Sequence, residues 1–337
     1  MEKCDFLILG QGLAGTCLAL RLAMSGRDYR IVDDGCPDSA SRNAAGLMNP
    51  VTGRRMALTW NFEEVWGNST YFYSEAFHFL LHRSGSFLQK KTIRRMLHTT
   101  EEMNFLEAKS AWAGYGDTVQ IKGTGDENPV FGKTAGEAKI NSGYRLDVPE
   151  FLSIALEYFK SENKLTGEKF LPEELKEAGN FWNYKGMSFR NVVSCLGLGC
   201  PWVSEMLWPV KGQIYVLEGL PDWGDDVQKT EHFLIPLSGD QVLAGSTYER
   251  EFSHLLPDKE GYETITASIR PELKPELRIA RSWAALRPTT PDRRPVIREL
   301  KRGLWAINGL GAKGVSLAPF AAEEYLRLIQ QVPESAH

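Results

Sequence analysis

Short apolar runs alternate with glycine-rich turns at the start of the chain, and this pattern predicts its first structural unit. Residues 6–9 are a continuous apolar run, residues 10–15 have the sequence Gly-Gln-Gly-Leu-Ala-Gly, and residues 16–23 are again mostly apolar. A second short run, residues 29–32, ends at the acidic pair Asp33-Asp34. Runs of four residues are typical of buried strands, whereas the run after the glycines is long enough for a helix. The predicted order is therefore strand, glycine turn, helix, strand and acid.

The position of each glycine in this turn has a physical explanation. Gly10 permits a tight turn out of the strand, Gly12 lets backbone N–H groups approach a pyrophosphate, and Gly15 lets the helix lie close to the sheet. Leu13 and Ala14 then stand at the positive end of the helix dipole, where phosphates bind. The acids that follow have the spacing at which a carboxylate accepts a hydrogen bond from a ribose hydroxyl. The pattern predicts a dinucleotide site, and an ordinary strand–helix turn is the alternative.

The middle of the chain alternates between helical and strand patterns. Residues 60–81 carry many aromatic side chains at helical spacing, which favours a helix with a buried face. His78 and His82 lie four residues apart within it, but no companion carboxylate motif accompanies them, so no metal site is predicted. Residues 84–138 break often at glycines and indicate strands and loops of an inserted subdomain. Asp147 fits the N-cap of a further helix.

The second half of the chain contains several strand patterns and a second glycine turn. Residues 191–199 form a buried-strand run, and residues 209–217 alternate like a strand. A Ser-Gly-Asp turn at residues 238–240 separates two further strand runs and predicts a hairpin. At the end, residues 304–308 predict a strand, residues 309–314 form the turn Gly-Leu-Gly-Ala-Lys-Gly, and an amphipathic helix follows over 316–330.

The two glycine turns at opposite ends of the chain favour one cofactor class. Both are strand-to-helix junctions that can direct a helix N-terminus at a bound group. A nicotinamide dehydrogenase needs only the first turn. A flavoprotein gains from the second, because a helix dipole near the N1/C2 carbonyl edge stabilises the anionic reduced ring.

Composition sets limits on these interpretations. The chain has 337 residues, enough for two intertwined domains. Its formal net charge is −4, so no overall positive charge indicates binding to nucleic acid. A small local basic patch is the alternative that this net charge leaves open. Its five cysteines are odd in number and contain no CxxC pair, which argues against a disulfide framework or zinc site and fits a reducing cytoplasm. No apolar run is long enough to cross a bilayer, and the N-terminal run is interpreted as mature structure rather than a signal peptide.

Several blocks together resemble the D-amino-acid-oxidase-like FAD-dependent oxidoreductases, above all glycine oxidase and sarcosine oxidase, and also the oxidase half of the enzyme that modifies wobble uridine in tRNA. These blocks are the first glycine turn, residues 41–48, residues 192–197, residues 283–297 with the sequence Trp-Ala-Ala-Leu-Arg-Pro-Thr-Thr-Pro-Asp-x-x-Pro-Val-Ile, and the second glycine turn. The resemblance implies an α/β fold in which a Rossmann-like FAD-binding domain is joined to a second, mostly antiparallel β-sheet substrate domain. It implies a FAD-binding domain formed by residues 1–75, 141–209 and 284–337, with residues 76–140 and 210–283 forming the substrate domain.

The resemblance also implies which residues contact FAD. The loop from Ser41 through Arg42, Asn43, Ala44, Ala45 and Gly46 to Met48 would pass beside the isoalloxazine ring. Cys195 and Gly197 would end a strand near the adenosine or pyrophosphate, and Gly309, Gly311, Ala312, Lys313 and Gly314 would contact the pyrimidine edge of the flavin. The cysteine to which sarcosine oxidase attaches its flavin has no counterpart here, so noncovalent FAD is expected.

Arg287 is the expected substrate anchor. It resembles the arginine that pairs with the substrate carboxylate in glycine and D-amino-acid oxidases, and a planar guanidinium fixes a carboxylate by two hydrogen bonds. The alternative is a structural arginine that supports the 288–295 loop. Tyr248 and Phe233 resemble walls of the substrate pocket, with sheet packing as the alternative, and Met48 and Asn49 lie next to the flavin loop.

Further cations and competing functions complete the predictions. Lys313 would stabilise the reduced flavin or a bound anion, or else face solvent at a helix start; Arg54 and Arg55 would add a second anion contact or be solvated. The predicted function is FAD-dependent oxidation of the C–N bond of a small carboxylated amine, with O₂ or another electron acceptor. The alternatives are an oxidase acting on a carboxymethylated amine of tRNA, a flavin-binding protein without turnover, and a nicotinamide-only dehydrogenase, which leaves the second glycine turn unexplained.

Overall fold

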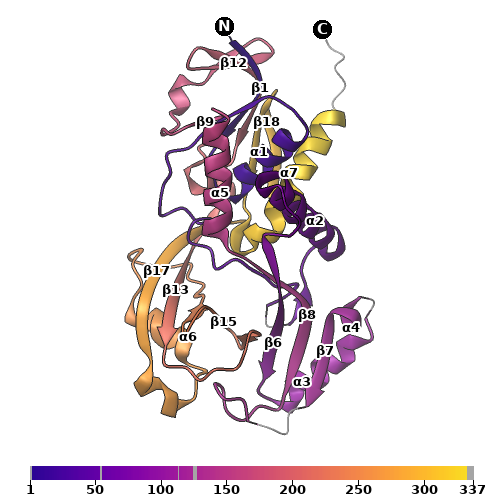
Figure 1. Cartoon of the computed structure of the whole chain (residues 1–337), viewed down its shortest axis with the longest axis vertical. Helices are drawn as coiled ribbons and strands as arrows, with labels where there is room; N and C mark the ends of the chain where they lie inside the picture. Colours follow the sequence, from indigo (N-terminus) through magenta and orange to yellow (C-terminus); the bar gives the residue numbers. More distant parts are fainter. Residues whose placement is uncertain (1, 54, 113, 124–126, 332–337) are drawn as a thin grey trace.

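The structure is a computed structural model that describes residues 2–53, 55–112, 114–123 and 127–331. Two β-sheets organise it (Figure 1). One lies in the upper part of the view with helices α1, α2, α5 and α7, and the other occupies the lower part with strands β6, β8, β13 and β17. The mixed α/β class with two sheet-containing parts confirms the predicted fold class.

The first sheet has eight strands within the described residues. Its central strands run parallel in the order β12-β1-β2-β9, with β19 parallel to β12 on the other side. Antiparallel strands lie on the β12 side, where β11 pairs with β12, β10 with β11 and β18 with β19, whereas the other edge is β9, parallel to β2. The strands are β1 (Glu2–Leu9), β2 (Tyr29–Val32), β9 (Leu165–Thr166), β10 (Lys176–Ala178), β11 (Phe181–Tyr184), β12 (Met187–Ser194), β18 (Val296–Lys301) and β19 (Leu304–Asn308). The carboxyl ends of parallel strands meet at one edge, which is where α/β proteins bind ligands.

Four helices pack with this sheet, and their bounds follow from local sequence. They are α1 (Leu13–Met24), α2 (Phe62–Leu81), α5 (Val148–Ser161) and α7 (Gly314–Gln331). α5 begins as predicted, because Asp147 caps it by accepting a hydrogen bond from the Glu150 amide at 3.1 Å. α2 buries the Trp66, Phe72 and Tyr73 rings of the aromatic run and leaves Tyr71 exposed.

The second sheet has nine strands within the described residues, in the order β17-β13-β16-β15-β14-β6-β8-β3, with β7 beside β8. Most pairs are antiparallel, as predicted. The strands are β3 (Leu47–Met48), β6 (Leu88–Leu97), β7 (Val119–Gly123), β8 (Gly136–Leu146), β13 (Trp208–Glu218), β14 (Val227–Lys229), β15 (Phe233–Pro236), β16 (Val242–Gly245) and β17 (Arg278–Thr289). The predicted hairpin is β15–β16, which turns at residues 238–240.

The segment 84–138 contains helices that its sequence pattern did not indicate. α3 (Thr100–Ser110) and the short α4 (Tyr115–Thr118) lie beside β7. α3 buries only Leu106 and Lys109, so it lacks the continuous apolar stripe that marks most helices in a sequence. The remaining elements are α6 (Lys259–Thr266), the small pair β4 (Val51–Thr52) and β5 (Ala57–Leu58), and 3₁₀ turns at Pro172–Glu174, Gly197–Gly199, Ser204–Met206, Pro271–Glu276 and Gly311–Lys313.

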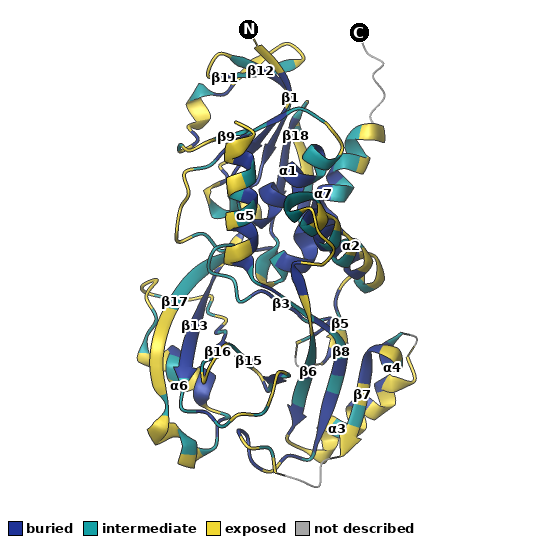
Figure 2. Ribbon diagram, viewed as in Figure 1, coloured by how far each residue is buried: buried dark blue, intermediate teal, exposed yellow. Residues whose placement is uncertain are grey.

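Buried side chains concentrate between the first sheet and its helices and on both faces of the second sheet (Figure 2). All five cysteines are free, and four of them are buried. None of the described helices is both long and apolar enough to cross a membrane. The predicted division into FAD-binding and substrate segments at residues 75, 140, 209 and 283 stays a prediction.

Candidate active site

A cavity of about 1210 Å³ is lined by both sheets and by segments from both ends of the chain. Gly10, Asp33, Cys195 and Asn308 line it from the carboxyl ends of β1, β2, β12 and β19. The second sheet contributes side chains of β13, β15 and β17. Typical ligand pockets have volumes of roughly 300–1,000 Å³, so this cavity is large enough for a dinucleotide together with a small substrate.

The first glycine turn has the close backbone packing that its sequence predicts. Gly10 has a φ of +98°, and a Cβ there would lie 2.8 Å from the Cys195 carbonyl oxygen. A Cβ on Gly15 would lie 1.8 Å from the Gly10 carbonyl oxygen, so Gly15 lets the start of α1 pack on the turn without itself lining the cavity. A Cβ on Gly12 would lie 2.9 Å from the Ser41 hydroxyl oxygen. These contacts allow only glycine at Gly10 and Gly15.

The Asp33 carboxylate is tied to the same turn. It accepts hydrogen bonds from the Gln11 amide at 2.7 Å and from the Gly35 amide at 2.8 Å, and the Arg42 guanidinium lies 3.6 Å away. Asp33 and Asp34 both line the cavity, and Asp34 accepts a hydrogen bond from the Cys36 amide. Gln11, which sequence reasoning passed over, therefore links the acid to the glycine turn.

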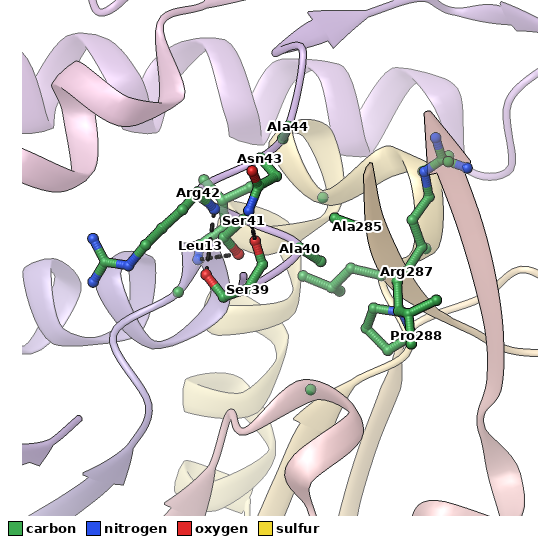
Figure 3. A pocket seen from close by; sticks show the side chains of 18 of the residues that line it. Leu13, Ser39, Ala40, Ser41, Arg42, Asn43, Ala44, Ala285, Arg287 and Pro288 are labelled. Carbon is green, nitrogen blue, oxygen red and sulfur yellow. Dashed lines mark hydrogen bonds between the residues drawn. The ribbon is translucent and has the colours of Figure 1, made fainter. Parts of the chain in front are cut away.

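The loop after Asp34 lies against the N-terminus of α1. The Leu13 amide donates to the Ser41 hydroxyl at 3.0 Å. Figure 3 shows the labelled residues of this loop on one side of the pocket and Ala285, Arg287 and Pro288 of β17 on the other. The Trp283 indole N–H of β17 donates to the Asn43 carbonyl at 3.1 Å, which holds the loop to the second sheet.

Most of the predicted loop residues line the cavity, and one does not. The lining residues are Ser41, Arg42, Asn43, Ala44, Ala45, Gly46 and Asn49. Gly46 has a φ of +82°, and a Cβ there would lie 1.8 Å from the Leu146 carbonyl oxygen. Met48 is 1% exposed and lies outside the cavity wall in β3, paired with Tyr144. Arg55 is exposed, and Arg54 lies outside the described residues.

The C-terminal glycine turn meets the N-terminal one. A Cβ on Gly314, at the start of α7, would lie 3.1 Å from Leu13 Cδ1, at the start of α1. Gly311, Ala312 and Gly314 line the cavity, as do Cys195 and Gly197 from the end of β12. The start of α1 and the residues from which α7 begins therefore border one space.

Lys313 and Gly309 stand behind this corner rather than in the cavity wall. The Lys313 ammonium donates to the Thr59 hydroxyl at 2.7 Å, and burial followed by the nearby Arg293 lowers its pKa. Gly309 has a φ of +70° and packs against Thr290. Neither Lys313 nor Gly309 therefore forms part of the cavity wall.

Arg287 lines the cavity and is fixed by the segment that follows β16. Its Nη1 donates to the Thr247 carbonyl at 3.1 Å and its Nη2 to the Ser246 hydroxyl at 2.6 Å. Neither described hydrogen bond goes to the 288–295 loop. A Cβ on Gly212 would lie 1.8 Å from Nη2, so this glycine provides the space that the guanidinium occupies.

The electrostatic setting of Arg287 suits an anion. Burial lowers its pKa, while Tyr248 and Glu249 raise it, and a guanidinium stays protonated in proteins. Two of its five N–H donors are used by Ser246 and Thr247, which leaves three for a ligand. Phe233 and Tyr248 line the same cavity, and Tyr248 is 48% exposed.

Several lining residues were not predicted as site residues. They are Gln11, Leu47, Lys229, Glu231, Gly212 and Ser246, among others, and Trp283 was part of a family-like block without a predicted role. Most of them come from strands or turns of the second sheet, where pairing between distant segments decides which side chain faces the cavity. No local motif marks such positions.

Comparison with known proteins identifies a domain of the chain. Residues 163–328 match the family model described as DAO, FAD dependent oxidoreductase. The chain contains a DAO FAD-dependent oxidoreductase domain. DAO-family proteins are enzymes that bind FAD, which confirms the predicted cofactor and the prediction of an enzyme.

Two relatives span nearly all of this chain. The uncharacterized oxidoreductase YurR of Bacillus subtilis (strain 168) is 23% identical over 96% of this chain and 94% of its own length. The tRNA 5-methylaminomethyl-2-thiouridine biosynthesis bifunctional protein MnmC of Idiomarina loihiensis is 21% identical over 96% of this chain, which spans 55% of that protein.

Solved DAO-family structures share the fold. Glycine oxidase from Geobacillus kaustophilus superposes with a TM-score of 0.81 at 20% identity, over 100% of this chain and 97% of that one. Iminodiacetate oxidase from Chelativorans sp. BNC1 superposes with a TM-score of 0.75 at 19% identity, over 99% and 97% of the two chains.

Proposed function

We propose that this protein oxidises the C–N bond of a small carboxylated amine or amino acid, and that Arg287 holds the substrate carboxylate. One observation supports this proposal above all. Residues of the first glycine turn, residues of the second glycine turn and the Arg287 side chain all line the same cavity. The fold shared with glycine oxidase and iminodiacetate oxidase supports an amine substrate.

The residues present fit FAD. The start of α1 offers backbone N–H groups, and Leu13 and Ala14 at this end line the cavity. The Leu13 N–H donates to the Ser41 hydroxyl. This end of α1 can therefore hold a pyrophosphate. Asp33 would hold the ribose, and Ala44, Ala45 and Gly46 leave room for a flat ring between the loop and β17. Bound noncovalently, FAD supplies a hydride acceptor.

The protein's own residues bind and orient the substrate. Arg287 has two N–H groups committed to Ser246 and Thr247, and its remaining donors can take a carboxylate in two-pronged geometry. This contact fixes the Cα–H relative to the flavin site, which is where orientation lowers the barrier. Phe233 and Tyr248 would close the sides of the pocket around the amine. Lys313 would act through the start of α7 rather than by touching the substrate.

The reaction balances without a further protein group. With FAD bound as the hydride acceptor, the neutral amine would lose a hydride from Cα while its nitrogen lone pair forms the C=N bond, and water would hydrolyse the resulting iminium ion to a carbonyl compound and the protonated amine, or ammonium from a primary amine. The electrons then pass to O₂ or another acceptor. Oxygen-electrode traces alongside assays with an artificial acceptor would distinguish an oxidase from a dehydrogenase.

The test is anaerobic reduction of the FAD-loaded protein by glycine, sarcosine, D-amino acids, proline and related secondary amines. We expect at least one of them to bleach the flavin. Arg287→Ala should weaken apparent affinity for that amine about 10–100-fold, the value of a lost charge-assisted hydrogen-bond pair. Arg281→Ala is the matched control, since Arg281 is an exposed residue of the same strand. Colourless protein that takes up no FAD, or unchanged kinetics in Arg287→Ala, would contradict the proposal.

A second candidate is oxidation of a carboxymethylated amine on tRNA, which the similarity to MnmC favours. The formal net charge of −4 opposes long-range attraction to nucleic acid. Retention on immobilised tRNA that weakens with salt, together with flavin reduction by a carboxymethylated tRNA, would favour this candidate over a free amine.

A further inference from the structure

We propose that the substrate carries a second acidic group and that Lys229 binds it, opposite the carboxylate held by Arg287. This inference rests on the proposed function and narrows it to dicarboxylated amines. Lys229 lines the same cavity as Arg287 but comes from β14, on the other side of Phe233.

The register of the second sheet places Lys229 in the cavity wall. Trp283 pairs with Ile214, Ile214 with Gly245, Gly245 with Phe233, and Phe233 with Lys229, so these residues form one row across five strands. Directly paired residues share a face of a sheet. All five members of the row line the cavity. Lys229 therefore ends an otherwise apolar wall with a positive charge.

The Lys229 ammonium has donors to spare. Within the described residues, its one hydrogen bond goes to the Glu231 carbonyl oxygen at 2.5 Å, and an ammonium group has three N–H donors. Burial, followed by the neighbouring Arg95, lowers its pKa to about 8, so the group is mostly charged at neutral pH. A buried charge with unused donors costs free energy that an anionic ligand would recover.

Charged groups of both signs surround Lys229. Arg95 is paired with Lys229 across the β6–β14 ladder, and burial lowers its pKa, while Glu102 and Glu231 raise it. Glu231 is exposed and lines the cavity, and its negative charge raises the pKa of Lys229. His232 points its Nδ1 to the Ser246 carbonyl at 3.1 Å, and burial lowers its pKa, so it adds no charge at neutral pH.

The two cations reach one cavity from different strands. Arg287 is fixed at Ser246, next to the end of β16, and Lys229 lies on β14, two strands away. Both residues line the cavity, so a ligand with an acidic group at each end could contact both of them. A short dicarboxylated amine, such as an N-carboxymethyl amino acid or a 2-aminopentanedioate, is the class of ligand that we expect.

The test uses unreactive ligands, so that it does not depend on turnover. The FAD-loaded protein is titrated with butyrate and with glutarate, and binding is measured from the change in the visible flavin spectrum. We expect glutarate to bind at least 10-fold more tightly than butyrate. Lys229→Met should weaken glutarate binding about 10–100-fold and change butyrate binding less than 3-fold, whereas Lys229→Arg should keep the preference.

The controls separate the two proposals. Lys90→Met removes an exposed lysine of β6 and should change neither affinity. A wild-type protein without preference for glutarate, or a Lys229→Met variant that keeps it, would overturn the role of Lys229. If Arg287→Lys leaves butyrate binding unchanged and no amine bleaches the flavin, the proposed function fails instead. FAD content and far-UV circular dichroism show whether each variant is folded.

Discussion

Lys211 offers the sharpest test of how the mouth of the cavity is held. Its side chain is 1% exposed, and its ammonium lies 3.0 Å from Asp258 Oδ2 and 3.3 Å from Glu249 Oε2. Both acids belong to the stretch that surrounds Leu255 and Leu256, two exposed leucines that line the cavity. The buried lysine on β13 therefore fastens this cavity-lining segment to the second sheet.

Lys211→Met keeps the length of the side chain and removes its charge. Breaking a buried ion pair costs roughly 3–5 kcal/mol, and because Asp258 and Glu249 keep 29% and 26% of their side chains exposed, we expect the lower end, about 3 kcal/mol. For a chain of this size that corresponds to a fall in Tm of about 4 °C. Loosening of the 249–258 segment should also raise KM more than it lowers kcat.

The assay is urea unfolding followed by far-UV circular dichroism and by flavin fluorescence, with kinetics on the best amine. Lys259→Met is the control, since Lys259 is 89% exposed and its ion pair with Glu263 is worth less than about 0.5 kcal/mol. Combining Lys211→Met with Asp258→Asn and Glu249→Gln should restore most of the loss, because no uncompensated charge then remains. A loss below about 1 kcal/mol in Lys211→Met would refute the reasoning.

Two further predictions concern the cations of the cavity. Gly212→Ala should displace the Arg287 guanidinium, because the alanine Cβ would lie 1.8 Å from Nη2. We expect butyrate to bind about 10-fold more weakly to this variant, with FAD content unchanged. The control is Gly167→Ala, whose Cβ would meet open space and which should have no effect. Burial lowers the pKa of Lys229 to about 8, so the Lys229 ammonium loses its proton and its charge as the pH rises through that value. Glutarate should therefore bind progressively more weakly to the wild type from pH 7 to pH 9. Lys229→Arg should show no such dependence, because guanidinium does not titrate there; a pH-independent wild type would contradict the assignment.

The first unit of the fold could be predicted because its constraints are local. Gly10 needs a positive φ and Gly15 has no room for a side chain, so the strand–turn–helix order is already fixed by residue types at short spacing. Asp147 similarly marks the start of α5 by a hydrogen bond three residues away. Such local patterns can be recognised in the sequence without knowledge of the rest of the structure.

The second sheet could be predicted only in outline. Nothing in the sequence around Lys229 indicates that its strand pairs with β6 and so faces the cavity, because that register is set by segments more than a hundred residues apart. Gly212 looks like any glycine until Arg287 is seen beside it. α3 was missed because only two of its residues are buried. Whether Lys313 serves the reaction also stays a prediction, since its ammonium is directed at Thr59.

The contact between Leu13 and Gly314 has a consequence for biosynthesis. About three hundred residues separate the two walls of the nucleotide groove, so the groove can form only after the residues of α7 have been synthesised. Until then the apolar side chains of α1 that pack against α7 lack this partner. We therefore expect a chain that is truncated before α7 to aggregate and to bind FAD poorly.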